Sequence, residues 1–173
     1  MKKIFFIVFV TGCIALSLLS SCRAHPTSTS YYTYQTECLN VELDGSQTLR
    51  AYGMGRDRAD AVEQAYKNAV RDVIFKGISS GSKECQTKPI LFEVNAEEKY
   101  QTYFSKFFAD RTPINRFENN YSRFISSRDE RSSQRMGRRP VSQNVDQDVY
   151  SVVVRVLREE LKQQLIKDGI LKQ

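Results

Sequence analysis

The stretch Gly53–Ile78, GMGRDRADAVEQAYKNAVRDVIFKGI, decides the fold of this chain. Asp57 is placed to cap a helix, with Asp60 three residues later in the position of a capping-box acid. Gly77 is typical of a helix end. The apolar positions between them recur at helical spacing: Ala59, Val62, Ala65, Tyr66, Ala69, Val70 and Val73. Because this face is rich in alanine, we expect a long amphipathic helix that lies close against a sheet.

The segments on either side of this helix predict an antiparallel sheet. In 37–43 apolar and polar residues alternate, as in a half-buried strand, with Leu39, Val41 and Leu43 on one face. Asp44–Gly45 is a favoured hairpin turn, and 47–52 then forms the returning strand. The valine-rich segment 149–157 alternates in the same way and predicts a strand near the middle of the sheet.

Two further helices complete the expected fold. Asn95 is a candidate N-cap for a helix that continues to Asp110 and carries a broad aromatic face. The members of that face are Tyr100, Tyr103, Phe104, Phe107 and Phe108. A short C-terminal helix follows the 149–157 strand and ends at Gly169. We therefore expect an α+β class: an antiparallel sheet, made by the N-terminal hairpin and later strands, packed against the alanine-rich helix, with the aromatic-rich and C-terminal helices beside it.

The first residues indicate export. MKK is a positive n-region, and IFFIVFVTGCIALSLL is an apolar stretch too short for a convincing membrane-spanning helix. The run closes with Leu19-Ser20-Ser21-Cys22, which resembles the lipobox of bacterial lipoproteins. This resemblance implies a signal peptide over 1–21 and lipidation, for example with palmitate, of Cys22. The alternative is an ordinary signal peptide with an incidental cysteine.

The remaining sequence predicts a tether followed by one domain. Residues 22–34 are polar and rich in serine and threonine, as expected of a flexible tether. The chain has 173 residues, of which 40% are hydrophobic and 27% charged, so 35–173 has room for a single globular domain. Arg23, rather than an aspartate, follows Cys22. By the lipoprotein resemblance this favours an outer-membrane protein that faces the periplasm.

Removal of the signal would leave one pair of the four cysteines in the mature domain. Cys13 is then discarded and Cys22 is consumed by lipid, which leaves Cys38 and Cys85 in an oxidising compartment. We expect a disulfide between them, the alternative being two separate buried thiols. Neither lies in a CxxC pair, so a redox-catalytic role has little support.

The segment 111–139 is the most polar part of the chain, with eight arginines against three acids. Its first part, 114–126, predicts a strand, and 127–140 predicts a long hairpin tip or a mobile loop, so we expect a basic loop around 127–147. Such a loop is either solvated, or contacts anionic headgroups or an acidic partner. The candidate partner surface combines aromatic and basic residues: Tyr103, Phe107, Arg128, Arg131 and Arg135.

Three pieces of the chain together have a familiar pattern: Ala51-Tyr52-Gly53-Met54-Gly55, the helix core from Asp60 to Asp72, and Val152 to Ile170. They cover roughly a third of the chain. They resemble small bacterial envelope lipoproteins and the N-terminal domain of the flagellar assembly protein T family. The resemblance implies an α+β domain that helps to assemble an envelope-spanning complex, first of all a secretion apparatus. Cys38, Cys85 and the basic segment depart from that pattern, so no flagellar role is carried over.

The sequence favours a non-enzymatic protein. The single histidine, His25, lies in the tether, which leaves no histidine-based general base, triad or metal cluster. No GxGxxG or GK[ST] motif indicates a bound cofactor. The formal charge of +6 falls to +4 without Lys2 and Lys3, and together with the periplasmic anchor this argues against nucleic-acid binding. A structural or assembly subunit is expected, the alternatives being a periplasmic small-ligand or cell-envelope binding lipoprotein and a hydrolase.

Overall fold

The computed structural model of the chain describes residues 34–85, 87–110, 120–128, 130–142 and 145–172. The chain divides into two compact units, Met1–Thr33 and Tyr34–Gln173, and the described residues all belong to the second. The expected signal peptide, the lipidated Cys22 and the tether up to Thr33 therefore lie outside the described residues. Within the described ranges, no helix is both long enough and apolar enough to cross a membrane.

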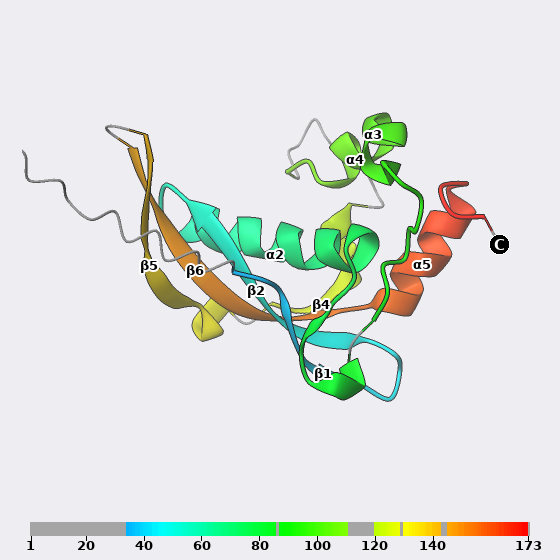
Figure 1. Ribbon diagram of the computed structural model, residues 1–173, viewed down its shortest axis with the longest axis horizontal. Helices are drawn as coiled ribbons and strands as arrows, with labels where there is room; N and C mark the ends of the chain where they lie inside the picture. The colour runs from blue at the N-terminus through cyan, green and yellow to red at the C-terminus, as the bar shows by residue number, and fades with distance from the viewer. Residues whose placement is uncertain (1–33, 86, 111–119, 129, 143–144, 173) are drawn as a thin grey trace, which may run out of the picture. The chain divides into compact units, whose positions relative to one another are not determined.

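A six-stranded, mostly antiparallel sheet is the framework of the second unit (Figure 1). Its strands are β1 (Glu37–Val41), β2 (Gln47–Gly55), β3 (Ser80–Gly81), β4 (Ile125–Arg128), β5 (Gln134–Ser142) and β6 (Val145–Val156). They lie in the order β3-β1-β2-β6-β4, and β5 also pairs with β6. Among the described strand pairs, only β1–β3 is parallel. The expected mixed fold with a largely antiparallel sheet is confirmed.

Helix α2 (Arg58–Phe75) follows β2 directly, and its ends are set by local sequence. The Asp57 carboxylate accepts a hydrogen bond from the Asp60 N–H at 2.9 Å, which satisfies a free donor of the first turn. At the other end Gly77 adopts a φ of +74°, and its N–H donates to the Asp72 carbonyl at 2.7 Å. The buried residues of α2 are Ala61, Val62, Ala65, Tyr66, Ala69, Val70, Val73 and Ile74.

Two glycines let α2 approach the sheet at backbone distance. A Cβ atom on Gly53 would lie 2.2 Å from the Ala61 carbonyl oxygen and 2.3 Å from the Ala65 nitrogen. A Cβ atom on Gly55 would lie 2.3 Å from the Ala61 nitrogen. Since α2 packs against both β2 and β6, these glycines set the spacing between the helix and the centre of the sheet.

The aromatic segment forms two short helices rather than one. These are α3 (Ala96–Lys99) and α4 (Gln101–Phe107), separated at Tyr100, whereas the sequence predicts a continuous helix to Asp110. Asn95 also differs from the expectation of an N-cap. Its φ of +58° is left-handed and its side chain makes no capping hydrogen bond, because side-chain capping needs an extended backbone at that position.

Phe107 is fully buried and was wrongly expected on a partner surface. Its ring packs edge-on against Phe108, with centroids 4.9 Å apart, and stacks on Phe124 at 5.9 Å. Phe104 meets Phe75 of α2 edge-on at 4.7 Å. The aromatic face of α4 therefore belongs to the core, where aromatic clusters of this kind are most often found.

The expected strand over 114–126 is described only in its second half, since 111–119 lie outside the described residues. Residues Tyr121–Phe124 form a 3-10 helix, with the Asn120 side chain accepting from the Ser122 N–H at 3.1 Å. The Asn120 amide also donates to the Ala109 carbonyl at 2.6 Å. Strand pairing then begins only at β4.

Cys38 and Cys85 are joined as a disulfide pair, with Cα atoms 5.8 Å apart and both side chains buried. The inward orientation of Cys38 reverses the expected burial of β1. Leu39 and Val41 are more than a third exposed, and Leu43 is completely exposed. A register shift between Cys38 and Asn40 accompanies this arrangement. Within β1 only Cys38 is buried, so the burial of this strand does not follow the predicted alternation.

The expected basic loop around 127–147 is mainly strand. β5 pairs with the first half of β6 as an antiparallel hairpin, at the end of the sheet away from helix α5 (Arg158–Lys167) (Figure 1). Gly137 and Pro140, residue types that disfavour a regular strand, both adjoin register shifts of this ladder. A bulged edge strand accommodates such residues, and this explains why the segment pairs in spite of them.

Candidate functional site

The described residues show no cluster of metal ligands. No group of three or more histidine, cysteine, aspartate or glutamate side chains within them could hold a metal ion. His25 and Asp129 lie outside the described residues. The adjacent Glu159 and Glu160 are both exposed in the first turn of α5, where acids favour the helix dipole. The surface features that remain are a basic hairpin and a small pocket.

The hairpin presents an open strand edge. β4 and β5 together occupy the side of β6 that faces away from β2. Among the described strands β5 pairs with β6 alone, so its other side offers main-chain N–H and C=O groups. Met136 and Val141 on the same strand are both exposed, by 42% and 56%.

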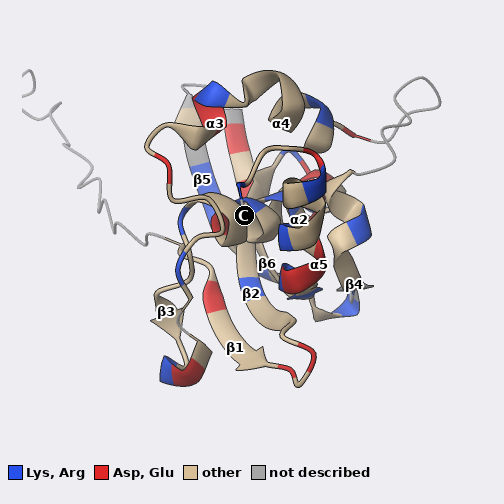
Figure 2. Ribbon diagram, turned by 90° about the vertical axis from the view of Figure 1, so that its right-hand side faces the viewer, with Lys and Arg blue, Asp and Glu red and all other residues tan. Residues whose placement is uncertain are grey.

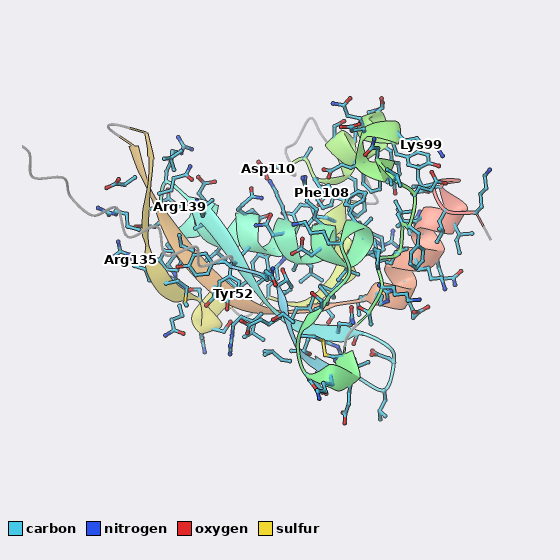
Figure 3. All side chains as sticks on the ribbon, viewed as in Figure 1. Tyr52, Lys99, Phe108, Asp110, Arg135 and Arg139 are labelled. Atoms are coloured by element: carbon cyan, nitrogen blue, oxygen red, sulfur yellow. A yellow bond between two sulfur atoms is a disulfide. The ribbon has the colours of Figure 1, made fainter. Side chains whose placement is uncertain are left out.

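β5 and the turn before it are strongly basic. The sequence from Arg131 to Ser142 contains four arginines and no acid, and basic residues mark β5 in Figure 2. The guanidinium groups of Arg135 and Arg138 donate to the same Asp148 oxygen, at 2.8 and 3.1 Å. Arg139 is exposed and forms no ion pair with any described residue. Arg135 and Arg139 lie on the hairpin, at the opposite end of the domain from Lys99 (Figure 3).

The carboxylate of Asp148 stays negatively charged because two arginines share it. Hydrogen bonds from Arg135 and Arg138 hold the pKa of Asp148 below its usual range, so Asp148 is ionised at neutral pH. Hydrogen bonding to Asp148 in turn raises the pKa of Arg135. Two cations share this carboxylate, and Asp146, opposite Pro140, is the other described acid of the hairpin. Positive charge is therefore left over along β5.

The base of the hairpin is tied to α2. The Arg58 guanidinium donates to the Ser133 hydroxyl at 2.7 and 2.9 Å. Arg128 of β4 lies over the Tyr66 ring, 5.1 Å from its centroid, and forms a 3.5 Å ion pair with Glu63. These contacts attach the start of β5 to the rigid helix, so the basic strand has a defined position relative to the core.

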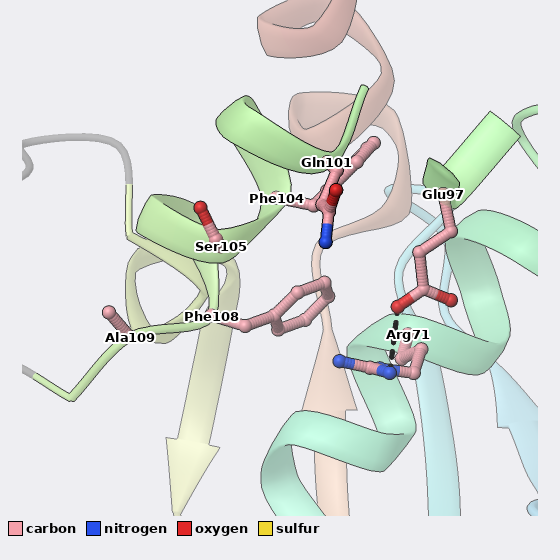
Figure 4. Close-up of a pocket in the computed structure, with 7 residues that line it drawn as sticks. All are labelled: Arg71, Glu97, Gln101, Phe104, Ser105, Phe108 and Ala109. Carbon is pink, nitrogen blue, oxygen red and sulfur yellow. Dashed lines mark ion pairs between the residues drawn. The ribbon is translucent and has the colours of Figure 1, made fainter. Parts of the chain in front are cut away.

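A pocket of about 330 Å³ lies between α2 and α4 (Figure 4). Its charged wall is the pair Arg71–Glu97, with 2.8 Å between Nη1 and Oε1. The Arg71 guanidinium also lies over the Phe108 ring, 4.8 Å from its centroid, and its Nε is buried without a hydrogen-bond partner among the described atoms. Gln101 and Ser105 supply polar groups from α4. The pocket combines one cation, one anion and an aromatic ring.

The residues singled out from the sequence separate into two places. Arg128 ends β4, Arg131 lies in the turn before β5, and Arg135 lies on β5 itself. Tyr103 is half-buried on α4, where its hydroxyl donates to Asp168 at 2.7 Å, so it does not join them. Sequence reasoning missed the contributions of Arg138, Arg139 and Asp148. The signal that points to the two arginines is the acid-free stretch from Arg131 to Ser142, whereas the role of Asp148 follows only from its pairing opposite Arg138.

Comparison with known proteins gives no relative from which a function could be transferred. No protein-family model matches the chain, and neither a curated protein nor a solved structure matches it.

Proposed function

We propose that this chain is a non-enzymatic, lipid-anchored periplasmic protein of the outer membrane. It acts as a structural or assembly subunit of an envelope-spanning complex, with a secretion apparatus as the first candidate. The anchor is supported by the lipobox-like sequence ending at Cys22. The partner-binding role is supported by the surface of the hairpin.

The observation that carries the proposal is the basic, open-edged strand β5. An exposed strand edge is a ready template for pairing with another chain. Exposed arginines and apolar side chains on that edge are also the residue types that protein interfaces favour at their centre, particularly arginine and methionine. Arg58 holds the start of the hairpin to α2, and Arg128 holds the neighbouring β4 to the same helix, so a partner bound there would be braced against the whole domain.

The helix and sheet support a scaffold role for the rest of the domain. The alanine face of α2 lies on β2 and β6, with Gly53 and Gly55 at the closest approach. The Cys38–Cys85 pair fastens the far edge of the sheet to the loop after α2. A domain braced in this way keeps the orientation of its surface strands, as a subunit of a large assembly requires.

The proposal is tested in intact cells of the native host by chemical crosslinking and purification of the full-length protein. The wild type is expected to bring down a defined set of envelope proteins, and its deletion is expected to break up the complex that they form. Capture of lipid without any protein would remove the support for a structural subunit.

The matched control is the Cys22→Ser variant, which keeps the domain and lacks the proposed anchor site. Radiolabelled fatty acid is expected to label the wild type and not this variant. Absence of label from the wild type would contradict the lipoprotein assignment, independently of the crosslinking result.

A second candidate function is supported by the pocket at Arg71. A periplasmic small-ligand or cell-envelope binding lipoprotein would place an anionic or aromatic ligand group in the pocket, beside Arg71 and Phe108. Native mass spectrometry of the purified protein tests it. A bound small molecule that is lost in Arg71→Ala would favour this function over the structural one.

A further inference from the structure

We infer that β5 binds an extended, acidic segment of a partner protein, which adds to the sheet as a further strand along Gln134–Arg139. The inference deepens the proposed function and rests on it, because it names the chemistry of the partner at the same surface. Main-chain hydrogen bonds to the open edge supply affinity, and carboxylates opposite the arginines supply specificity.

Charge decides which kind of strand can occupy this edge. Arg135, Arg138 and Arg139 lie within five residues of one strand, and Asp148 is shared by two of them. A second copy of β5 would bring another set of arginines against these, and like charges facing each other across strands are unfavourable. The occupant must bring acids, and glutamate or aspartate suits the planar guanidinium group.

The ends of the site are set by the backbone. Pro140 has no N–H to donate, and a register shift lies between Pro140 and Ser142. Pairing of an added strand therefore ends at Arg139, and the register shift between Arg135 and Gly137 places one bulge within the site, which the added strand must follow. At the other end the Arg58–Ser133 hydrogen bonds hold the residue before β5 against α2. About six residues of edge remain, which is the length of an ordinary strand.

An anionic bilayer is the alternative occupant, and the open edge argues against it. Lipid headgroups can pair with arginine, but they cannot form a regular ladder with the main-chain groups of β5. A strand-forming acidic peptide can pair with both the arginines and the main-chain groups of β5.

The experiment uses the full-length protein in nanodiscs of zwitterionic lipid. The probe is a fluorescent ten-residue peptide of alternating glutamate and valine, followed by fluorescence anisotropy. We expect binding that weakens with added salt. A peptide of the same sequence, N-methylated at alternate main-chain nitrogens, keeps the charge and loses the donors. It is expected to bind at least about tenfold more weakly.

Two charge-reversal variants make a matched pair. Arg139→Glu is exposed on β5 and is expected to weaken peptide binding by about tenfold. Lys83→Glu makes the same charge change on an exposed residue beside β1, at the other side of the sheet, and is expected to change binding by less than about twofold. Equal losses of peptide affinity in both variants would show that only the net charge of the protein matters, and would overturn the inference.

The remaining outcomes separate this inference from the proposed function. If the peptide fails to bind, and β5 amides gain hydrogen-exchange protection only when phosphatidylglycerol is added to the nanodisc, the hairpin is a membrane contact and the inference is wrong. If the peptide fails to bind while the anchored protein still captures an envelope complex, the inference fails and the proposed function stands. Peptide binding without any complex in cells would support the inference and contradict the proposed function.

Discussion

Arg135 of β5 donates a hydrogen bond to Asp148 of β6 across the hairpin, with 2.8 Å between Nη2 and Oδ1. Arg138 reaches the same oxygen, and both lower the pKa of Asp148. A carboxylate whose pKa is lower in the folded state stabilises the fold above its unfolded pKa, and this contribution is lost as pH falls through the folded pKa. The hairpin is therefore expected to weaken in acid.

Asp148→Asn tests this coupling. At neutral pH the variant is expected to be less stable than the wild type, since two arginines lose their shared anion. As pH falls below about 4, the usual pKa of an aspartate, the difference is expected to shrink. Thermal unfolding midpoints measured between pH 7 and pH 2 provide the check. A difference that stays constant over this range would mean that the Asp148 charge is irrelevant to the hairpin.

Gly53→Ala is expected to destabilise the fold by about 3 kcal/mol or more, because its Cβ would collide with backbone atoms of Ala61 and Ala65. The control is Gly169→Ala. A Cβ atom at position 169 would meet nothing within 4 Å. This substitution therefore costs only the strain of placing alanine at a φ of +71°, about 1 kcal/mol. Urea unfolding of both variants measures the two effects. Similar losses of stability in the two variants would show that α2 and the sheet do not approach as closely as these distances require.

Removal of the Cys38–Cys85 pair is expected to reduce stability by about 4 kcal/mol, the loop-closure entropy of a link between residues 47 apart in the sequence. The double variant Cys38→Ala/Cys85→Ala should unfold at lower urea concentration than the oxidised wild type. Dithiothreitol should shift the wild type and leave the double variant unchanged. If thiol titration shows that reduction is complete and the stability of the wild type is still unchanged, the disulfide would be contradicted.

Tyr103→Phe removes the 2.7 Å hydrogen bond that ties α4 to Asp168 at the end of α5, and is expected to cost about 1 kcal/mol. Burial, with the neighbouring Asp168 carboxylate, raises the pKa of Tyr103. The folded state therefore keeps the proton when the unfolded state loses it, so stability falls as pH rises above about 10. Tyr103→Phe should abolish this part of the alkaline loss. An alkaline slope identical in both proteins would show that Tyr103 ionises normally.

Local signals in the sequence identified the features that depend on neighbouring residues. Asp57 as a helix cap, Gly77 as a helix end and the pairing of Cys38 with Cys85 are described by the structure. Each follows from the chemistry of one or two side chains. The largely antiparallel sheet followed from alternation and the Asp44–Gly45 turn, which are also local signals.

Features that depend on tertiary context were less accessible. Alternation over Leu39–Leu43 predicts one buried face, but none of these residues is buried and the inward position of the strand falls on Cys38. β5 contains Gly137 and Pro140, so its strand state depends on pairing with β6. Arg128, Arg131 and Arg135 were recognised in the sequence, whereas Arg138, Arg139 and the carboxylate that Asp148 shares between Arg135 and Arg138 depend on this pairing and were not.

The central claim is that the anchored protein binds an envelope partner through β5. The most direct measurement places a photocrosslinking amino acid at position 139 of the full-length protein in living cells, with position 83 as the control. We expect a discrete protein adduct from position 139, absent from position 83, whose partner carries an acidic extended segment at the crosslink. Adducts with lipid alone, or the same adducts from both positions, would contradict the claim.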